Sequence, residues 1–204
     1  KSFNRNLSVD GDKSLSIRWA LIASQVIGTS KAKNLLQSED VNNTLRCLKK
    51  LGIKISRKQN IYSIEGRGLN GFIFKKNITL DAGNSGTLGR LILSLLIKSP
   101  YKIKIVGDKS LSKRDFSRVI EPLKKIGVNF YPNNKFKLPI FIKGTDYLRP
   151  INYLEKRGSA QCKTCIMLAS LNVPGVTKIT AKNSRDHTEK MFQSLKVPIK
   201  IKRK

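Results

Sequence analysis

The sequence predicts an α/β fold made of three repeated units, and three observations support this class. The string LKKLGIKI at 48–55 recurs as LKKIGVNF at 123–130 and, more weakly, as FQSLKVPI at 192–199. A more apolar, helix-like stretch precedes each copy, at residues 15–28, 87–98 and 160–171. Short runs rich in β-branched and aromatic residues lie between and after these stretches. Successive copies are 75 and 69 residues apart, and each interval holds one helix–strand–helix–strand–strand unit.

The first unit is expected at about residues 11–77. Its apolar helix begins near Leu15, and a second, amphipathic helix ends in LKKL at 48–51. Gly52 follows where a helix C′ glycine belongs, and the chain then continues as a strand. The run IYSIEG at 61–66 predicts a further strand.

The second unit is expected at about residues 78–146. Its apolar helix contains the run from Leu91 to Leu96, which we assign to the core together with Trp19 of the first unit. YKIKIVGD at 101–108 and LPIFIKG at 138–144 predict strands. Gly127 marks the end of the second helix, and Pro122 is expected to kink or begin that helix.

The third unit is expected at about residues 147–204. It contains the apolar helix 160–171, the strand-like VTKITAK at 176–182 and a last helix before Lys196. In the third copy, Pro198 replaces the glycine that ends the helix in the other two copies, which weakens the resemblance of this copy to them. The alternating segment KVPIKIKRK at 196–204 predicts a strand.

Composition excludes several classes of protein. Apolar residues make up 39% of the chain, so disorder is a poor fit. No apolar run is long enough for a membrane span. Three cysteines suit a reducing cytosol better than a disulfide framework.

Charge points to anionic ligands. Lys and Arg number 41 against 13 Asp and Glu, a formal net charge of +28. The basic residues are spread along the whole chain, with Lys outnumbering Arg 29 to 12, and no nucleic-acid-binding motif stands out. We therefore favour a lysine-rich surface with an anionic small-molecule site over a nucleic-acid groove, which stays as an alternative.

The starts of the three apolar helices share one pattern, in which a hydroxyl or glycine is followed about one turn later by a cation. The three cases are Lys13 and Ser14 with Arg18, GNSGT at 83–87 with Arg90, and Ser159 with Lys163. A helix N-terminus offers free amide donors and a partial positive charge, so it binds anions. If the fold gathers the three starts, they form one electropositive pocket. The alternative is that Ser14, Asn84 and Ser159 are ordinary helix caps with solvated cations nearby.

GDKSLS occurs twice, at 11–16 and 107–112. The copies begin 37 and 16 residues before the shared LKK element, so they occupy different places in the unit. We interpret the identity as a coincidence with respect to the fold.

Five longer motifs follow one another along the chain: GDKSLSIRWALIAS, LDAGNSGTLGRL, GDKSLSKRDFSRVIEPLKKIGV, GSAQCKTCIMLASLNVPGVT and SRDHTEKM. In this order they resemble the motifs of the 5-enolpyruvylshikimate-3-phosphate synthase family, also called 3-phosphoshikimate 1-carboxyvinyltransferases. The match covers almost all of the chain, and SAQ and SRDHTEKM are similar to the bacterial class II branch.

The resemblance implies an inside-out α/β lobe of three βαβαββ units, the enolpyruvyl transferase-like fold, with helix N-termini turned toward a cleft between two lobes. The chain resembles the N-terminal half of such an enzyme. Residues 11–204 would form a single lobe, and residues 1–10 would be a strand segment of the other, missing lobe.

The resemblance also implies an enzyme of the shikimate pathway, which serves aromatic amino-acid biosynthesis. The reaction transfers the enolpyruvyl group of phosphoenolpyruvate to the 5-hydroxyl of shikimate 3-phosphate and releases phosphate through a tetrahedral intermediate. These two small molecules are the implied partners, without metal, cofactor, nucleic acid or membrane. A cytoplasmic location and a monomeric full-length protein are expected, and this half alone is expected to be inactive.

The family's functional residues carry over motif by motif, with Lys13 as the catalytic residue between the two substrates. The implied shikimate 3-phosphate site consists of Lys13, Ser14, Arg18, Ser159, Ala160, Gln161 and Arg185. The implied phosphoenolpyruvate site consists of Lys13, Asn84, Gly86, Thr87, Arg114 and Gln161, with Arg90 as a weaker candidate.

Two departures and one position qualify this transfer. Asp10 stands where the family usually has Pro before GDKS, so the entry turn is expected to differ. The acidic residues and Lys that complete proton transfer belong to the other lobe, so no general base is assigned here. Gly86 stands where glyphosate-tolerant members can carry Ala, which suggests a glyphosate-sensitive enzyme.

The histidine and two of the cysteines favour structural interpretations. His187 is the only histidine and is expected to order a turn or helix start. Cys162 and Cys165 form a CxxC pair inside an apolar helix and are expected to be packing residues. A UDP-N-acetylglucosamine enolpyruvyl transferase shares the implied architecture and stays as a second alternative, although GDKSLSIR and SRDHTEKM fit it less well.

Overall fold

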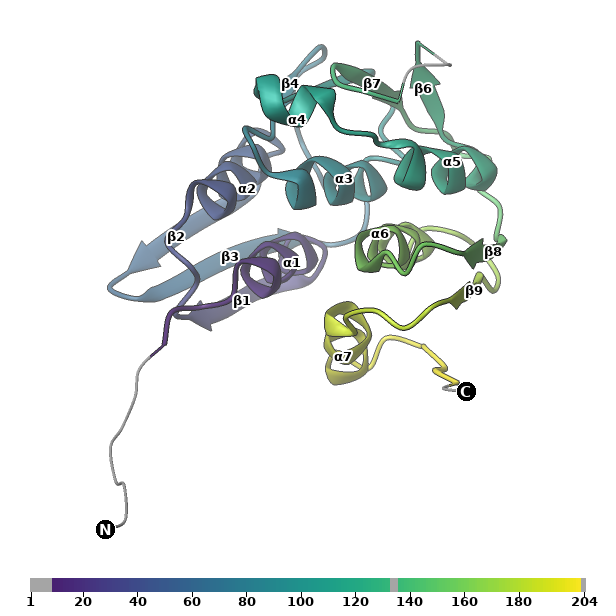
Figure 1. The fold of residues 1–204 in the computed structure, drawn as a ribbon. Helices are drawn as coiled ribbons and strands as arrows, with labels where there is room; N and C mark the ends of the chain where they lie inside the picture. Colours follow the sequence, from purple (N-terminus) through teal and green to yellow (C-terminus); the bar gives the residue numbers. More distant parts are fainter. Residues whose placement is uncertain (1–8, 133–135, 203–204) are drawn as a thin grey trace.

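The computed structural model describes residues 9–132 and 136–202 (Figure 1). The first part forms α1 (Lys13–Ala23), β1 (Ile27–Lys33), α2 (Glu39–Lys50), β2 (Lys54–Lys58) and β3 (Ile61–Arg67). The middle part forms β4 (Thr79–Asp81), α3 (Gly86–Leu95), β5 (Ile103–Val106), α4 (Lys109–Lys113), α5 (Ser117–Ile126), β6 (Asn129–Tyr131) and β7 (Ile140–Lys143). The last part forms β8 (Asn152–Glu155), α6 (Ala160–Ser170), β9 (Lys178–Ala181) and α7 (His187–Ser194).

The strands form three sheets, one for each part of the chain. The first has the antiparallel order β1-β3-β2, and the second has the order β4-β5-β7-β6, with β4 and β5 parallel. The third pairs β8 with β9 in parallel. The sheets lie on the outside, while α1, α3 and α6 lie between them (Figure 1). This arrangement confirms the predicted α/β class with its helices inside.

The element order shows the predicted repeat. β4, α3, β5, α5, β6 and β7 follow the βαβαββ order, with the short α4 inserted before α5. Within the described residues, the first part reproduces this order from its first helix onward and the third part reproduces it as far as its second helix.

The three repeated strings end their helices in the same way. Gly52 and Gly127 have positive φ values of 85° and 120°, as predicted for C′ glycines. The next residue donates its amide to a carbonyl five residues back in every copy: Ile53 to Leu48 at 3.1 Å, Val128 to Leu123 at 3.0 Å and Val197 to Phe192 at 2.9 Å. Lys196 takes the glycine's place in the third copy with a φ of 55°. The prediction that Pro198 replaces this chemistry is therefore wrong.

The two GDKSLS copies also share local structure. Asp12 caps α1 by accepting the Leu15 amide at 2.7 Å, and Asp108 caps α4 by accepting the Leu111 amide at 2.7 Å. They lie at different places in the unit, as expected, but each copy begins a helix. The identity is therefore not a coincidence at the level of local structure, because an aspartate side chain satisfies the free amides of the first turn.

A single core joins the three parts. Leu91 to Leu96 are buried, as predicted, and Trp19 packs against this core while partly exposed. Cys162 and Cys165 are free and buried, which agrees with a packing role. Pro122 lies inside α5 and does not begin it.

Neither of the two strands expected at the ends of the chain is found among the described residues. Residues 1–8 lie outside the described residues, and Val9 and Asp10 are not in a strand. The expected strand at 196–204 does not form over 197–202, because no described strand pairs with that segment. Among the described residues, no helix is both long and apolar enough to cross a bilayer.

Candidate functional site

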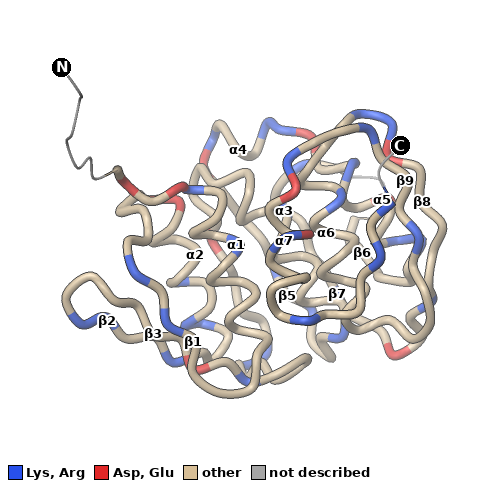
Figure 2. Tube along the Cα trace, turned by 90° about the horizontal axis from the view of Figure 1, so that it is seen from below, with Lys and Arg blue, Asp and Glu red and all other residues tan. Residues whose placement is uncertain are grey.

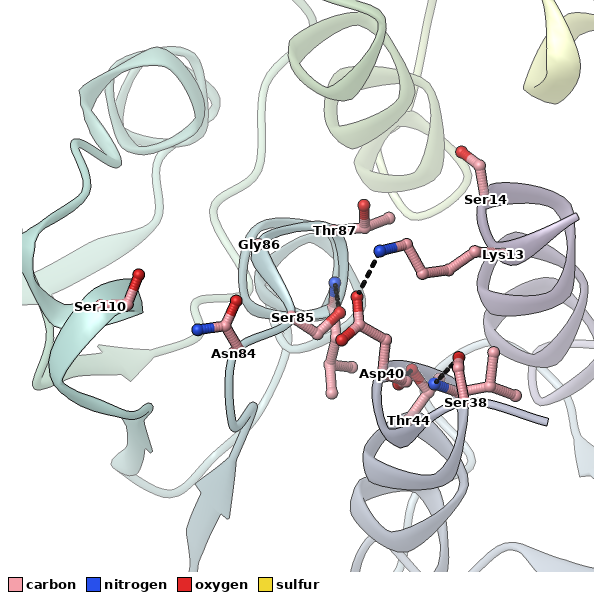
Figure 3. Close-up of polar contacts among 12 residues, drawn as sticks. Lys13, Ser14, Ser38, Asp40, Thr44, Asn84, Ser85, Gly86, Thr87 and Ser110 are labelled. Carbon is pink, nitrogen blue, oxygen red and sulfur yellow. Dashed lines mark hydrogen bonds and ion pairs between the residues drawn. The ribbon is translucent and has the colours of Figure 1, made fainter. Parts of the chain in front are cut away.

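The starts of α1, α3 and α6 lie on one side of the helical layer. Gln161, in the first turn of α6, donates to Thr87 Oγ1 in the first turn of α3 at 3.1 Å. The same amide accepts a hydrogen bond from Arg90 Nη1 at 3.0 Å. Lys13, the first residue of α1, points toward Thr87 (Figure 3). The structure thus brings together three helix N-termini. In the sequence, each is more than 70 residues from the next.

The residues that cap these helices differ in part from the candidates. Asp12, Ser85 and Ser159 accept amide hydrogen bonds at the starts of α1, α3 and α6. The alternative that Ser14 and Asn84 are ordinary caps is therefore wrong, whereas it holds for Ser159. Because neighbouring residues cap α1 and α3, the side chains of Ser14 and Asn84 are available for other contacts.

Ser14 and Arg18 contact each other on α1. Arg18 is 2% exposed, and its Nη1 donates to the Ser14 carbonyl at 3.2 Å and also to Ser14 Oγ. Burial lowers the pKa of Arg18, and the nearby charge of Arg185 lowers it further. A buried guanidinium with a second cation close by favours an anionic ligand.

Lys13 forms an ion pair with Asp40, in the first turn of α2 (Figure 3). The distance from Nζ to Oδ2 is 3.1 Å, and the Lys13 side chain is 54% exposed. The contact holds the ammonium group between α1 and the start of α3. The Asp40 carboxylate is 20% exposed and anchors the pair, while the more exposed ammonium group of Lys13 keeps its charge accessible.

Asn84 and Arg114 meet at the start of α3. Arg114 Nη2 donates to Asn84 Oδ1 at 3.2 Å, and Asn84 Nδ2 donates to Asp108 Oδ2 at 2.6 Å. The Asn84 hydrogen bond is the main reason why the pKa of Asp108 is lowered. The loop therefore holds the exposed cation of Arg114 next to Gly86 and the amides of the first turn of α3.

Gly86 faces two guanidinium groups. A Cβ atom added to Gly86 would lie 2.9 Å from Arg90 Nη1 and 3.2 Å from Arg114 Nη1. The hydrogen atom of glycine thus lets both cations approach the first turn of α3. This is the close backbone approach for which glycine is suited at an anion site.

Arg90, the weaker candidate, is buried beside this turn. It donates to the Gly86 carbonyl at 3.3 Å and to the Asp115 carbonyl at 3.1 Å, and it lies 5.0 Å from the centre of the Phe116 ring. Burial lowers its pKa to about 10, with a smaller contribution from Arg118. Arg90 therefore carries a desolvated positive charge at neutral pH.

Ser159 and Ala160 begin α6, and both are partly buried. The Ser159 amide donates to Glu155 Oε2 at 2.9 Å, while its hydroxyl caps the helix by accepting the Cys162 amide at 3.2 Å. The carboxylate of Glu155 thus fixes the loop that leads into α6. This places Gln161 where it reaches Thr87.

Arg185 and Lys163 have different surroundings. Arg185 is exposed and lies close enough to Arg18 to lower its pKa. Lys163, expected as the cation of the third helix start, pairs instead with Glu189 of α7. The cation pattern therefore holds at α1 and α3 but not at α6, because a carboxylate far away in sequence neutralises Lys163.

Sequence reasoning missed several contributors. Asp40 and Arg118 lie near Lys13 and Arg90, yet neither belongs to a helix start that was compared across the repeats. Thr164 and Thr188 contact Arg18, and only the SRDHTEKM motif hinted at the second of them. His187 is the first residue of α7, as its expected place at a helix start requires, but its Nδ1 is buried without a hydrogen-bond partner in the described structure, so its ordering role stays a prediction.

Positive charge is spread well beyond these residues. Figure 2 shows Lys and Arg along all parts of the trace, as the sequence predicts.

A cavity of about 450 Å³ lies away from the three helix starts, beside Lys124, Gly127, Asn129, Tyr131 and Arg149. None of the predicted site residues lines it. Within residues 9–132 and 136–202, no group of three His, Cys, Asp or Glu side chains could hold a metal ion.

Known proteins resemble this chain over nearly its whole length. The family model of EPSP synthase (3-phosphoshikimate 1-carboxyvinyltransferase) matches residues 1–204. A 3-phosphoshikimate 1-carboxyvinyltransferase of Streptococcus pyogenes serotype M4 is 39% identical over 189 residues, which are 92% of this chain and 44% of the relative. The serotype M49 protein of the same name gives the same identity and coverage.

Solved structures give the same result. A structure of EPSP synthase from Acinetobacter baumannii matches with a TM-score of 0.89 and 33% identity, covering 96% of this chain and 44% of that one. The chain thus spans less than half the length of the relatives that it matches. The match of the family model over its whole length shows that the chain belongs to the EPSP synthase (3-phosphoshikimate 1-carboxyvinyltransferase) family.

Proposed function

We propose that this chain forms one lobe of an enzyme that transfers the enolpyruvyl group of phosphoenolpyruvate to the 5-hydroxyl of shikimate 3-phosphate. Family membership and the shared position of three helix N-termini support this proposal. Both substrates carry phosphate and carboxylate groups, which suit desolvated guanidinium groups and free helix amides.

The observation that carries the proposal is the position of Gln161. Its amide bonds Thr87 and Arg90 on one helix while its backbone lies at the start of another. Thr87 belongs to the proposed phosphoenolpyruvate side, and Ser159 and Ala160 belong to the proposed shikimate 3-phosphate side. Gln161 therefore joins the two proposed subsites, as a reaction between two bound substrates requires.

Roles follow from the surroundings of each side chain. Ser14, Arg18 and Arg185 would hold the anionic groups of shikimate 3-phosphate. The phosphate of phosphoenolpyruvate would be held by Asn84, Gly86, Thr87 and Arg114. The buried Arg90 would lie beside them, next to the first turn of α3.

Lys13 would lie between the two substrates. Its ammonium group would stabilise the negative charge that develops on the oxygens of the leaving phosphate as the tetrahedral intermediate collapses. We assign no residue of this chain as the general base for the 5-hydroxyl.

We propose further that residues 11–204 form one lobe with unit boundaries near residues 77 and 146. The intervals between β3 and β4 and between β7 and β8 support this division, because each sheet is completed before the next begins. A monomeric, cytoplasmic full-length protein is part of the same proposal and rests on the family alone.

The test is phosphate release by the purified full-length protein. Release should require both phosphoenolpyruvate and shikimate 3-phosphate. Release with UDP-N-acetylglucosamine in place of shikimate 3-phosphate, or no release with either acceptor, would contradict the proposal. Binding of a short RNA that weakens steeply with salt, together with no release, would favour a nucleic-acid-binding function instead.

A further inference from the structure

The SRDHTEKM motif contributes more to the site than the exposed Arg185. Thr188, in the first turn of α7, is 1% exposed, and Thr164 of α6 is 2% exposed. Their hydroxyl groups lie 2.8 Å apart. Two buried hydroxyls from different helices thus form a hydrogen-bonded pair.

This pair contacts one guanidinium group. Arg18 Nε donates to Thr188 Oγ1 at 3.2 Å, and Arg18 Nη2 donates to Thr164 Oγ1 at 3.4 Å. Arg18 Nη1 is directed to the other side, where it meets the carbonyl and hydroxyl of Ser14. The three nitrogens of the Arg18 guanidinium therefore donate to three different residues.

The geometry of arginine makes this arrangement consequential. The guanidinium is planar, so fixing Nε and Nη2 also fixes the direction of Nη1. α7 is itself held in place, because Glu189, the residue after Thr188, pairs with Lys163 of α6. The position of Thr188 relative to Thr164 is thus set by a second contact between α6 and α7.

We propose that Thr164 and Thr188 are positioning residues that fix the plane of the Arg18 guanidinium, so that Nη1 and the Ser14 hydroxyl together present donors to an anionic group of the substrate. The proposal deepens the proposed function and rests on it only for the identity of that substrate. Without the two hydroxyls, the guanidinium can turn away from Ser14 and its anion affinity falls.

The experiment uses Thr188→Val and Thr164→Val, which keep the shape of the side chain and remove the hydroxyl. Thr188→Ser keeps the hydroxyl and removes a methyl group. Thr177→Val is the matched control, because the Thr177 hydroxyl is buried without a hydrogen-bond partner in the described structure. Steady-state kinetics of the full-length protein give the KM for each substrate, and thermal unfolding checks that each variant is folded.

Each valine variant should raise the KM of shikimate 3-phosphate about tenfold, the effect of losing one hydrogen bond to a charged group. The KM of phosphoenolpyruvate should stay within about twofold, and Thr188→Ser and Thr177→Val should resemble the parent protein. An unchanged KM in both valine variants, or a Thr188→Ser variant as impaired as Thr188→Val, would overturn the proposal. If Thr188→Val does not fold, Thr164→Val and Thr188→Ser decide by the same criteria.

A second measurement separates this inference from the proposed function. Inorganic phosphate serves as the probe, and its Kd is measured by calorimetry for the parent protein and the same variants. If the parent protein does not turn over shikimate 3-phosphate, the proposed function fails. Weaker phosphate binding by both valine variants alone would still support the positioning role, and equal binding by all variants would refute it.

Discussion

Gly86→Ala probes the contact between a helix start and two cations. The new Cβ would lie 2.9 Å from Arg90 Nη1, about 0.5 Å inside the 3.4 Å at which ordinary contact begins. Arg90 Nη1 already lies 3.0 Å from Gln161 Oε1, so a shift of this size away from Gly86 can stretch that bond to about 3.5 Å, beyond useful hydrogen-bond length.

The expected cost is one hydrogen bond to a charged group. Such a bond contributes about 1.5–3 kcal/mol, and we expect the lower end because the tip of Arg90 can turn. The KM of phosphoenolpyruvate should therefore rise about tenfold. Stability should fall modestly as well, because the stretched bond lies within the folded protein, and the absence of a positive φ at Gly86 lets alanine offset only part of this loss.

The assay is steady-state kinetics of the full-length protein with each substrate varied, together with thermal unfolding. Gly89→Ala is the control on the same helix, because its Cβ would meet Phe116 at 3.4 Å and Ala82 at 3.5 Å, which is ordinary contact. A tenfold rise for Gly86→Ala with an unchanged Gly89→Ala is the predicted result. An unchanged KM in Gly86→Ala, or an equal rise in both variants, would refute the reasoning.

Three further predictions follow from the charged groups. Lys13→Met should lower kcat at least about a hundredfold, as expected for a lost donor to developing charge. Tm should also fall, because the Asp40 carboxylate, which is only 20% exposed, loses its ion-pair partner. Near-normal turnover would contradict the role of Lys13. Asn84→Ala should raise the pKa of Asp108 toward 3.8, so the stabilisation that this carboxylate contributes above 3.8 becomes smaller. NMR titration of the carboxyl checks this, and an unchanged pKa would contradict it. The pKa of Arg90 is lowered to about 10, so its buried charge opposes folding below pH 10, and this penalty diminishes as the pH rises above that value. Phosphate affinity should therefore fall through pH 10 more steeply in the parent protein than in Arg90→Met. Identical pH profiles would refute this.

The repeat could be predicted because helix ends follow local chemistry. Gly52 and Gly127 take the positive φ values that end α2 and α5, and the strings around them are nearly identical. The third copy looked weaker because glycine is missing. Lys196 nevertheless adopts the same conformation, since the hydrogen bond from Val197 to Phe192 offsets the strain of a non-glycine residue there.

The helix starts could be predicted only in part. Patterns of hydroxyls and cations identified Ser14, Arg18 and the GNSGT loop, because these residues act within one turn of their own helix. The actual caps, Asp12 and Ser85, were missed since each neighbours an equally suitable residue.

Contacts between distant helices could not be predicted from one sequence. Glu189 neutralises Lys163, and Thr164 and Thr188 hold Arg18, through packing of α1, α6 and α7. Nothing in the spacing of these residues indicates which of them meet, because the repeat period aligns equivalent positions rather than contacting ones.

The most direct test of the central claim is an NMR titration of the full-length protein with shikimate 3-phosphate, following backbone amides. The starts of α1, α3 and α6 should respond together, so the amides of Ser14, Thr87 and Gln161 should shift with one shared Kd. Shifts confined to one helix start, or dispersed over the outer sheets with unrelated affinities, would contradict the claim that the three helix starts form a single anion site.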